Sequence, residues 1–155
     1  ERAQQWQVQA TEMKKEHTYN QDGARLTLTG RIDRLEKSDS GYGIIDYKTG
    51  AVPSIDTVLS GEKIQLPFYA LLMGQEKIFR TAFLALDNET AREKAPLEGE
   101  SLNLLLDAVR ERLILLKRGL DAETPLPANG DLGTCRFCEM EGLCRREMWF
   151  NPPIV

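Results

Sequence analysis

The chain has 155 residues, of which 41% are hydrophobic, and a formal net charge of -4 at pH 7. This length allows one domain with a hydrophobic core and is short for two. The net negative charge argues against a polybasic protein that binds nucleic acid through overall charge, so any contact with DNA must be local. No apolar run approaches the roughly 20 residues needed to cross a bilayer, so we expect no membrane span.

The residues at the two ends of the chain suggest whether it is part of a longer protein and where in the cell it is found. It begins with Glu1 and has no secretory signal, so we expect a piece cut from a longer protein. Three cysteines lie close together near the C-terminus. An odd number of cysteines cannot pair completely, which favours a metal or cluster site over a secreted disulfide framework. A cytoplasmic location is therefore expected.

The first half of the chain has the residue alternation of three β-strands. The larger apolar residues of 6–13 and of 25–33 lie two apart, and the turn-like segment 20–23 between them predicts a hairpin. A second turn at 38–41 leads to residues 42–48, whose short continuous apolar centre fits a strand buried on both faces. We expect this third strand to be central in the sheet.

The second half of the chain has alternating helix and strand patterns. Residues 63–73 place apolar side chains at helical spacing, and Pro67 is tolerable there if the helix begins only a few residues earlier. Residues 79–86 predict a further strand, and 102–116 predict an amphipathic helix. After Pro125 we expect an irregular tail. The predicted fold is α/β, with a mixed central sheet of four or more strands flanked by helices.

Two carboxylates and a lysine are expected at the ends of neighbouring strands. Asp33 ends one strand, and Asp46 and Lys48 lie two apart on the next, so their side chains emerge on one face. A carboxylate beside Ile44 is costly to bury unless it is paired or binds a cation. Two carboxylates suit Mg²⁺ or Mn²⁺, which activates water for phosphodiester hydrolysis, with Lys48 positioning the water or stabilising charge. The alternative is a structural Asp46–Lys48 ion pair beside a solvated Asp33.

Three short motifs follow one another in the chain: Gly30-Arg-Ile-Asp33-Arg34, Asp46-Tyr-Lys-Thr-Gly50 and Gln65-Leu-Pro-Phe-Tyr69. Their order and spacing resemble the motifs of RecB-like nucleases in the PD-(D/E)xK superfamily, over most of the chain. The resemblance implies that Asp33, Asp46 and the main-chain carbonyl of Tyr47 bind the metal. It assigns the catalytic role to Lys48.

The resemblance also points to residues around this site. Gln65 and Tyr69 lie four apart on one helical face and, by resemblance, support the catalytic lysine and contact the substrate strand. Without the upstream motifs they would be a helix surface with a half-buried tyrosine. Arg31 and Arg34 flank the first aspartate and either reach phosphate oxygens or are solvated surface arginines. Glu12 resembles a Glu of the family's first strand and is a candidate neighbour of the site.

Cys135, Cys138 and Cys144 place three thiols within ten residues. Zinc and iron–sulfur sites usually have four, so one ligand is missing. The AddB-like nucleases that the chain resembles hold a 4Fe-4S cluster with three such cysteines and one far upstream, which implies a structural cluster in the full-length protein but not in this fragment. A Cys135–Cys138 disulfide, adventitious zinc or free thiols are the alternatives. His17 is expected at a strand end or in a hairpin, facing solvent rather than acting in catalysis.

The sequence therefore predicts a nuclease core in residues 1–124, lacking its N-terminal helical part, and a cysteine-bearing tail in residues 125–155 packed on it. The expected function is that of a metal-dependent DNA nuclease, by resemblance an exonuclease in DNA repair and recombination with a helicase-nuclease partner subunit. Two alternatives remain open. One is a catalytically silent domain of this fold that holds DNA or a partner, and the other is an unrelated metal-stapled interaction module.

Overall fold

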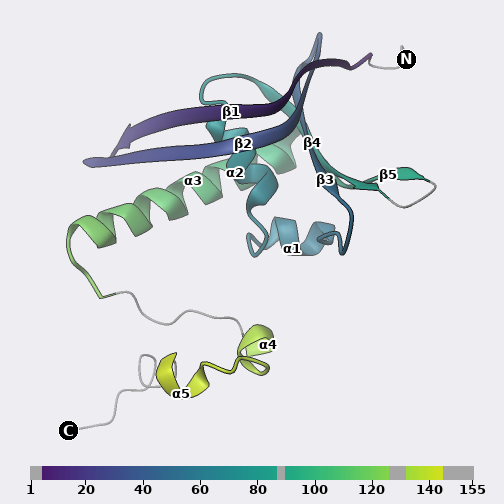
Figure 1. The fold of residues 1–155 in the computed structure, drawn as a ribbon. Coiled ribbons are helices and arrows are strands. Elements are labelled where there is room, and N and C mark those ends of the chain that lie inside the picture. The colour runs from purple at the N-terminus through teal and green to yellow at the C-terminus, as the bar shows by residue number, and fades with distance from the viewer. Residues whose placement is uncertain (1–4, 87–89, 126–131, 145–155) are drawn as a thin grey trace, which may run out of the picture. The chain divides into compact units, whose positions relative to one another are not determined.

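A computed structural model of the chain describes residues 5–86, 90–125 and 132–144. The chain divides into two compact units, residues 1–117 and 118–155. The elements in chain order are β1 (Gln7–Gln21), β2 (Ala24–Ser38), β3 (Gly41–Lys48), α1 (Ile55–Leu59), α2 (Gln65–Leu72), β4 (Ile78–Leu86), β5 (Ala91–Glu98), α3 (Gly99–Asp121), α4 (Leu132–Cys135) and α5 (Glu141–Cys144) (Figure 1). In the part of the chain that is described, no helix has both the length and the apolar character needed to cross a bilayer.

The five strands form one mixed sheet in the order β1-β2-β3-β4-β5. Strands β3 and β4 are parallel, and the other neighbours are antiparallel. A parallel pair needs a crossover connection, and the segment that contains α1 and α2 supplies it between β3 and β4. The mixed sheet with flanking helices confirms the expected α/β fold.

The hairpin of β1 and β2 is confirmed and is longer than the alternation predicted. Both strands have 15 residues and pair as far as Gln21 and Ala24. Asp22 and Gly23 between them have φ values of 52° and 78°, the backbone that a two-residue hairpin turn requires. Charged residues at 14–16 interrupt the apolar alternation, but their main chain still pairs across the hairpin.

His17 lies in the β1–β2 hairpin, one of its two expected places, but it is half-buried rather than solvent-facing. Its ring lies edge-on to that of Tyr19, with 4.6 Å between the ring centroids, and a Cβ added at Gly74 would lie 2.5 Å from it. The Tyr19 hydroxyl donates a hydrogen bond of 2.7 Å to the Leu71 carbonyl. These two side chains therefore join the hairpin to the end of α2.

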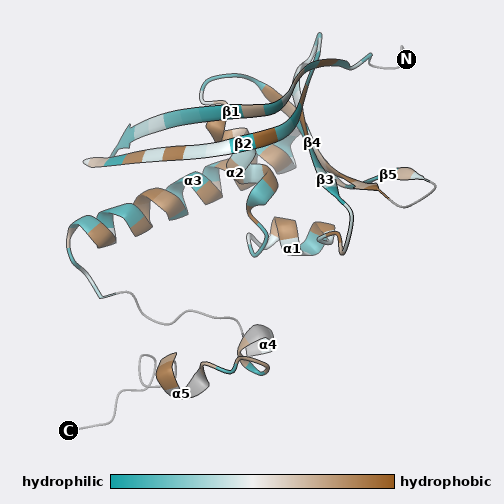
Figure 2. Cartoon of the chain, viewed as in Figure 1, coloured by the Kyte–Doolittle hydropathy of each residue, from teal (hydrophilic) through white to brown (hydrophobic). Residues whose placement is uncertain are grey.

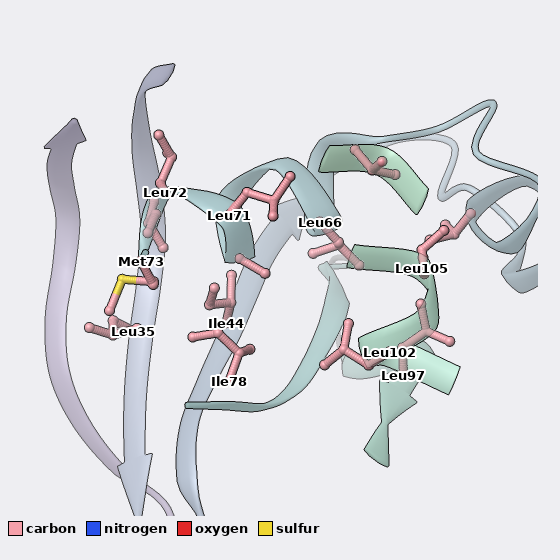
Figure 3. Close-up of a cluster of buried hydrophobic side chains, with 14 of the residues drawn as sticks. Leu35, Ile44, Leu66, Leu71, Leu72, Met73, Ile78, Leu97, Leu102 and Leu105 are labelled. Atoms are coloured by element: carbon pink, nitrogen blue, oxygen red, sulfur yellow. The ribbon is translucent and has the colours of Figure 1, made fainter. Parts of the chain in front are cut away.

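The core lies where the helices pack on the sheet. Figure 3 shows side chains from both gathered there, among them Leu35, Ile44, Leu66, Leu72, Leu97, Leu102 and Leu105. Hydrophobic and hydrophilic segments alternate along α3 (Figure 2), as expected of an amphipathic helix, although it extends beyond the predicted 102–116 at both ends.

Helix α2 approaches the sheet closely. It begins at Gln65, so Pro67 lies in its first turn, as the sequence predicted. A Cβ added at Gly30 on β2 would lie 2.8 Å from Cδ1 of Leu72. The glycine therefore lets α2 lie against β2, and this contact brings the helix to the strand that carries Asp33.

Two elements of the first unit were not predicted. Strand β5 is mostly polar and exposed and contains Pro96, so it lacks an apolar alternation. It forms at the edge of the sheet, where it pairs only with β4. Helix α1 has five residues, too few for a helical period to be visible, and it is capped by Ser54, whose hydroxyl accepts a hydrogen bond from the amide of Thr57. In the tail, which was expected to be irregular, α4 and α5 are short helical turns.

Candidate functional site

The predicted acids lie where β2 and β3 separate. The two strands pair as far as Arg34 and Ile45, so Asp33 and Asp46 are the next residue of each strand. Instead of a further ladder bond, the amide of Tyr47 donates to Oδ2 of Asp33 over 3.0 Å. The Asp33 side chain thus binds a main-chain group that would otherwise lose its partner at this opening.

Asp46 is a buried carboxylate with a 1% exposed surface. Its Oδ1 accepts a 2.7 Å hydrogen bond from Nε2 of Gln65, and its Oδ2 forms a 2.7 Å ion pair with Nζ of Lys48. Among the described residues, Oδ2 has no hydrogen-bond partner beyond this ion pair. One oxygen of a buried carboxylate therefore has room for a further ligand.

Gln65 links the polar side chains of β3 to α2. Its Oε1 accepts a 2.8 Å hydrogen bond from Lys48, while its Nε2 donates to Asp46 and, over 3.2 Å, to the Tyr69 hydroxyl. The opposite orientation of the amide would direct its NH₂ at the ammonium group and its oxygen at the carboxylate, so these charged neighbours determine its direction. The structure brings together all five residues predicted to be catalytic.

The electrostatics of the cluster leave negative charge uncompensated. Burial raises the pKa of the Asp46 carboxyl above its ordinary value, Lys48 lowers it, and the nearby Asp33 carboxyl raises it further. The cluster has two carboxylates and one lysine, Lys48, which pairs with Asp46, is 25% exposed and also lies over the Phe83 ring. A bound cation would compensate this charge.

The donor set fits a hard divalent cation. Asp33 and Asp46 supply carboxylate oxygens, which such cations prefer. In residues 5–86, 90–125 and 132–144, no three His, Cys, Asp or Glu side chains are grouped so that they could hold a metal ion. The main-chain carbonyl of Tyr47 stays the predicted third ligand.

Three other candidates lie outside this hydrogen-bonded cluster. Glu12 and Arg31 form an ion pair of 2.9 Å and are both largely exposed. Arg34 pairs with Glu36 at 2.5 Å, and its side chain is 29% exposed. Sequence reasoning missed Glu36, which is 5% exposed. Its position two residues after Arg34 on a strand was a usable signal, since such side chains point to the same face.

The three cysteines lie in the second unit. The amide of Cys138 donates to the Cys135 carbonyl over 3.1 Å, and Cys144 ends α5. All three are free thiols in this structure. The 4Fe-4S cluster expected in the full-length protein stays a prediction, as does the expected division of the chain at residue 124.

Comparison with protein-family models matches residues 1–145 to the PD-(D/E)XK nuclease superfamily. The chain belongs to this superfamily. The matched range contains every predicted site residue, so the superfamily part of the resemblance is confirmed, whereas the RecB-like subtype stays a prediction. PD-(D/E)XK nucleases generally use divalent metals, in agreement with the donor set at Asp33 and Asp46.

Solved structures are also similar to the chain. One is described as "Crystal structure of SSO0001"; it is 18% identical, with a TM-score of 0.48. The match covers 87% of this chain and 59% of that chain, so the PD-(D/E)XK chain spans less than two thirds of the length of that protein. No curated protein matches the chain significantly.

Proposed function

We propose that this PD-(D/E)XK chain hydrolyses phosphodiester bonds of DNA with a divalent cation held by Asp33, Asp46 and the main-chain carbonyl of Tyr47. The observation that carries the proposal is the state of Asp46. Its carboxylate is 1% exposed and lies beside a second carboxylate, and among the described residues one of its oxygens is held only by the ion pair with Lys48. Such an arrangement is costly for a structural ion pair and is suited to a cation.

The side chains around the cation site have separate roles in this proposal. A divalent cation there would polarise the scissile phosphate and lower the pKa of the attacking water. Lys48 has three donors, of which Gln65 engages one, and its partial exposure allows another to reach a phosphate oxygen. Gln65 holds Lys48 and Asp46 at a fixed separation. The Tyr69 hydroxyl accepts a hydrogen bond from the amide of Gln65. The same network limits the rotamers of the lysine and the acid.

We infer a more specific function from the motif resemblance. The order and spacing of the three motifs support a RecB-like or AddB-like exonuclease domain that acts in DNA repair and recombination, in the cytoplasm and beside a helicase-nuclease partner subunit. The spacing of Cys135, Cys138 and Cys144 supports a structural 4Fe-4S cluster in the full-length protein. A fourth thiolate would have to come from outside this chain.

The test is degradation of end-labelled single- and double-stranded DNA in Mg²⁺ or Mn²⁺, by the chain and by its full-length parent. We expect Lys48→Ala and Asp46→Asn each to reduce the rate about a thousandfold, the scale of losing a charge-stabilising group. Lys94→Ala is the control, because Lys94 is an exposed lysine on β5.

Unchanged rates in both site variants would overturn the assignment of the active site. If a folded, metal-loaded parent binds labelled DNA without cleaving it, the domain is catalytically silent and holds DNA. Fluorescence anisotropy with the same DNA, measured in Ca²⁺, separates binding from cleavage.

A further inference from the structure

The hairpin of β1 and β2 extends beyond its pairing with the rest of the sheet (Figure 1). Strand β3 pairs with residues 34–38 of β2, whereas residues 24–32 of β2 pair with β1 alone. Within this extension, Leu28 and Ile32 belong to the core, and a Cβ added at Gly30 would meet α2. One face of the extension therefore packs on α2. The residues between these point to the opposite face, here called the outer face.

The outer face of the hairpin is polar along its length. The cross-strand pairs on it are Arg25–Asn20, Thr27–Thr18, Thr29–Glu16 and Arg31–Lys14, and all of these residues except Thr18 are exposed. Apart from Glu16, each of these side chains can donate a hydrogen bond, which is the contact that phosphate oxygens accept. None of them is aromatic, so the face offers no platform on which nucleobases could stack. Its chemistry therefore suits the phosphates of a nucleic acid rather than the bases.

Two cations lie directly opposite each other on this face. Lys14 and Arg31 are cross-strand partners, and like charges at such positions destabilise a sheet. Arg31 has an ion pair of 2.9 Å with Glu12, but the two side chains are 62% and 58% exposed, and exposed pairs contribute little to stability. Lys14 has no ion-pair partner among the described residues. An anion bound between the two cations would remove their repulsion.

The two cations line an open hollow close to the candidate metal site. Its lining is made of Lys14, Lys15, Glu16, Thr29, Gly30 and Arg31, which are three cations, one acid and two uncharged residues. Arg31 precedes Asp33 by two residues on β2, a distance of about 7 Å along a strand. The whole chain has a net charge of -4, so the hollow concentrates positive charge locally beside the predicted cation ligand.

We propose that this hollow binds phosphates of the substrate DNA strand next to the scissile phosphate, with Lys14 and Arg31 as the contacting residues. This inference rests on the proposed function, which puts the scissile phosphate at the cation held by Asp33 and Asp46. Arg31 exchanges Glu12 for two oxygens of one phosphate, and Lys14 binds from the neighbouring strand as a point charge. Because these contacts are made to the DNA backbone, they do not depend on base sequence.

The test is DNA binding by the whole chain, measured by fluorescence anisotropy at one Ca²⁺ concentration and a series of KCl concentrations. We expect Lys14→Met and Arg31→Met each to weaken binding of a labelled duplex about tenfold at low salt, the scale of one charge-assisted hydrogen bond. Each should also make the plot of log Kd against log salt shallower by about 0.9. Duplexes of unrelated sequence should lose the same affinity. Lys94→Met is the control, because it removes one exposed lysine from β5, at the opposite edge of the sheet.

The outcomes separate this inference from the proposed function. If Lys14→Met and Arg31→Met keep the salt dependence of the wild type, or if Lys94→Met changes it equally, the hollow is overturned as a phosphate site. Cleavage that is lost in Asp46→Asn would then leave the proposed function standing. If the two variants bind as expected but the wild type cleaves no DNA in Mg²⁺ or Mn²⁺, the proposed function is overturned, and the hollow stands as a DNA-binding site. A folded wild type that binds no DNA would overturn both.

Discussion

Ile44 and Asp46 lie two residues apart on β3, on the same face of the sheet, and are 0% and 1% exposed. For Ile44, burial against α2 contributes about 2 to 3 kcal/mol to the free energy of unfolding. For Asp46, the same degree of burial raises the pKa of the carboxyl and disfavours its charged form. Equal burial therefore stabilises the fold at one position and opposes it at the other, and the second position is the one to examine for function.

The largest expected change in stability is at the apolar position, Ile44. Ile44→Ala should lower the free energy of unfolding by about 3 kcal/mol, because it removes buried carbon atoms and leaves a cavity. Urea denaturation measures the change. Leu115→Ala is the control, since Leu115 is 68% exposed and its loss should cost less than about 0.5 kcal/mol. Equal losses in the two variants would contradict the described core.

The next effect is expected at the polar position. Mn²⁺ at about 100 times its dissociation constant should raise the free energy of unfolding by about 2.7 kcal/mol, because only the folded chain holds the site. Asp33→Asn and Asp46→Asn should abolish this gain. Thermal unfolding with Mn²⁺ or with EDTA measures it. An undiminished gain in both variants would show that the cation binds elsewhere.

Without metal, loss of the Asp46 charge should increase stability rather than decrease it. Asp46→Asn in EDTA should raise the free energy of unfolding at pH 7, because it removes a carboxylate whose charged form the fold disfavours, and the gain should be about 1.4 kcal/mol for each unit by which folding raises the pKa of Asp46. The raised pKa means that the stability of the wild type falls as the pH rises above 3.8, the ordinary value. The advantage of the variant should therefore shrink between pH 7 and pH 4. A constant difference across this range would mean that Asp46 is not the responsible group.

The smallest expected effect concerns a polar group inside the core. Thr81 on β4 is fully buried, and no described residue pairs with its hydroxyl. Thr81→Val should raise the free energy of unfolding by somewhat less than about 1 kcal/mol, because a methyl group replaces an unpaired hydroxyl. Thr18→Val should show no gain, since the Thr18 hydroxyl is hydrogen-bonded to that of Thr27 at 2.9 Å. Chemical denaturation of both variants decides this.

The sequence predictions were accurate where an element depends on residues that are neighbours in the chain, and less accurate where it depends on pairing with a distant segment. The apolar centre of β3 and the helical spacing of α2 depend on neighbouring residues, and both elements form within two residues of their predicted bounds. Strand β5 has no such signal, because it forms by pairing with β4 at the edge of the sheet. The half-burial of His17 was not predicted, because the length of β1 depends on pairing across the hairpin as far as Gln21.

The candidate site shows the same division. That Asp46 and Lys48 share a face follows from their spacing on one strand, and the resemblance of the motifs named their companions, Asp33, Gln65 and Tyr69. The hydrogen bonds that join Gln65 to both residues of β3 required the crossover that brings α2 over the strand. The Arg34–Glu36 pair was missed because the sequence does not reveal how deeply Glu36 is buried.

The amino-acid sequence by itself determined the α/β class, the hairpin and the central strand, because two- and four-residue periods are local properties of the backbone. The residues of a metal-dependent nuclease were indicated by the resemblance of its three motifs. Only the tertiary structure decided which polar groups pair and which oxygen of Asp46 is held by the ion pair with Lys48 alone. These contacts join residues from separate strands and helices, so their energies depend on distances and burial that arise only when the chain folds.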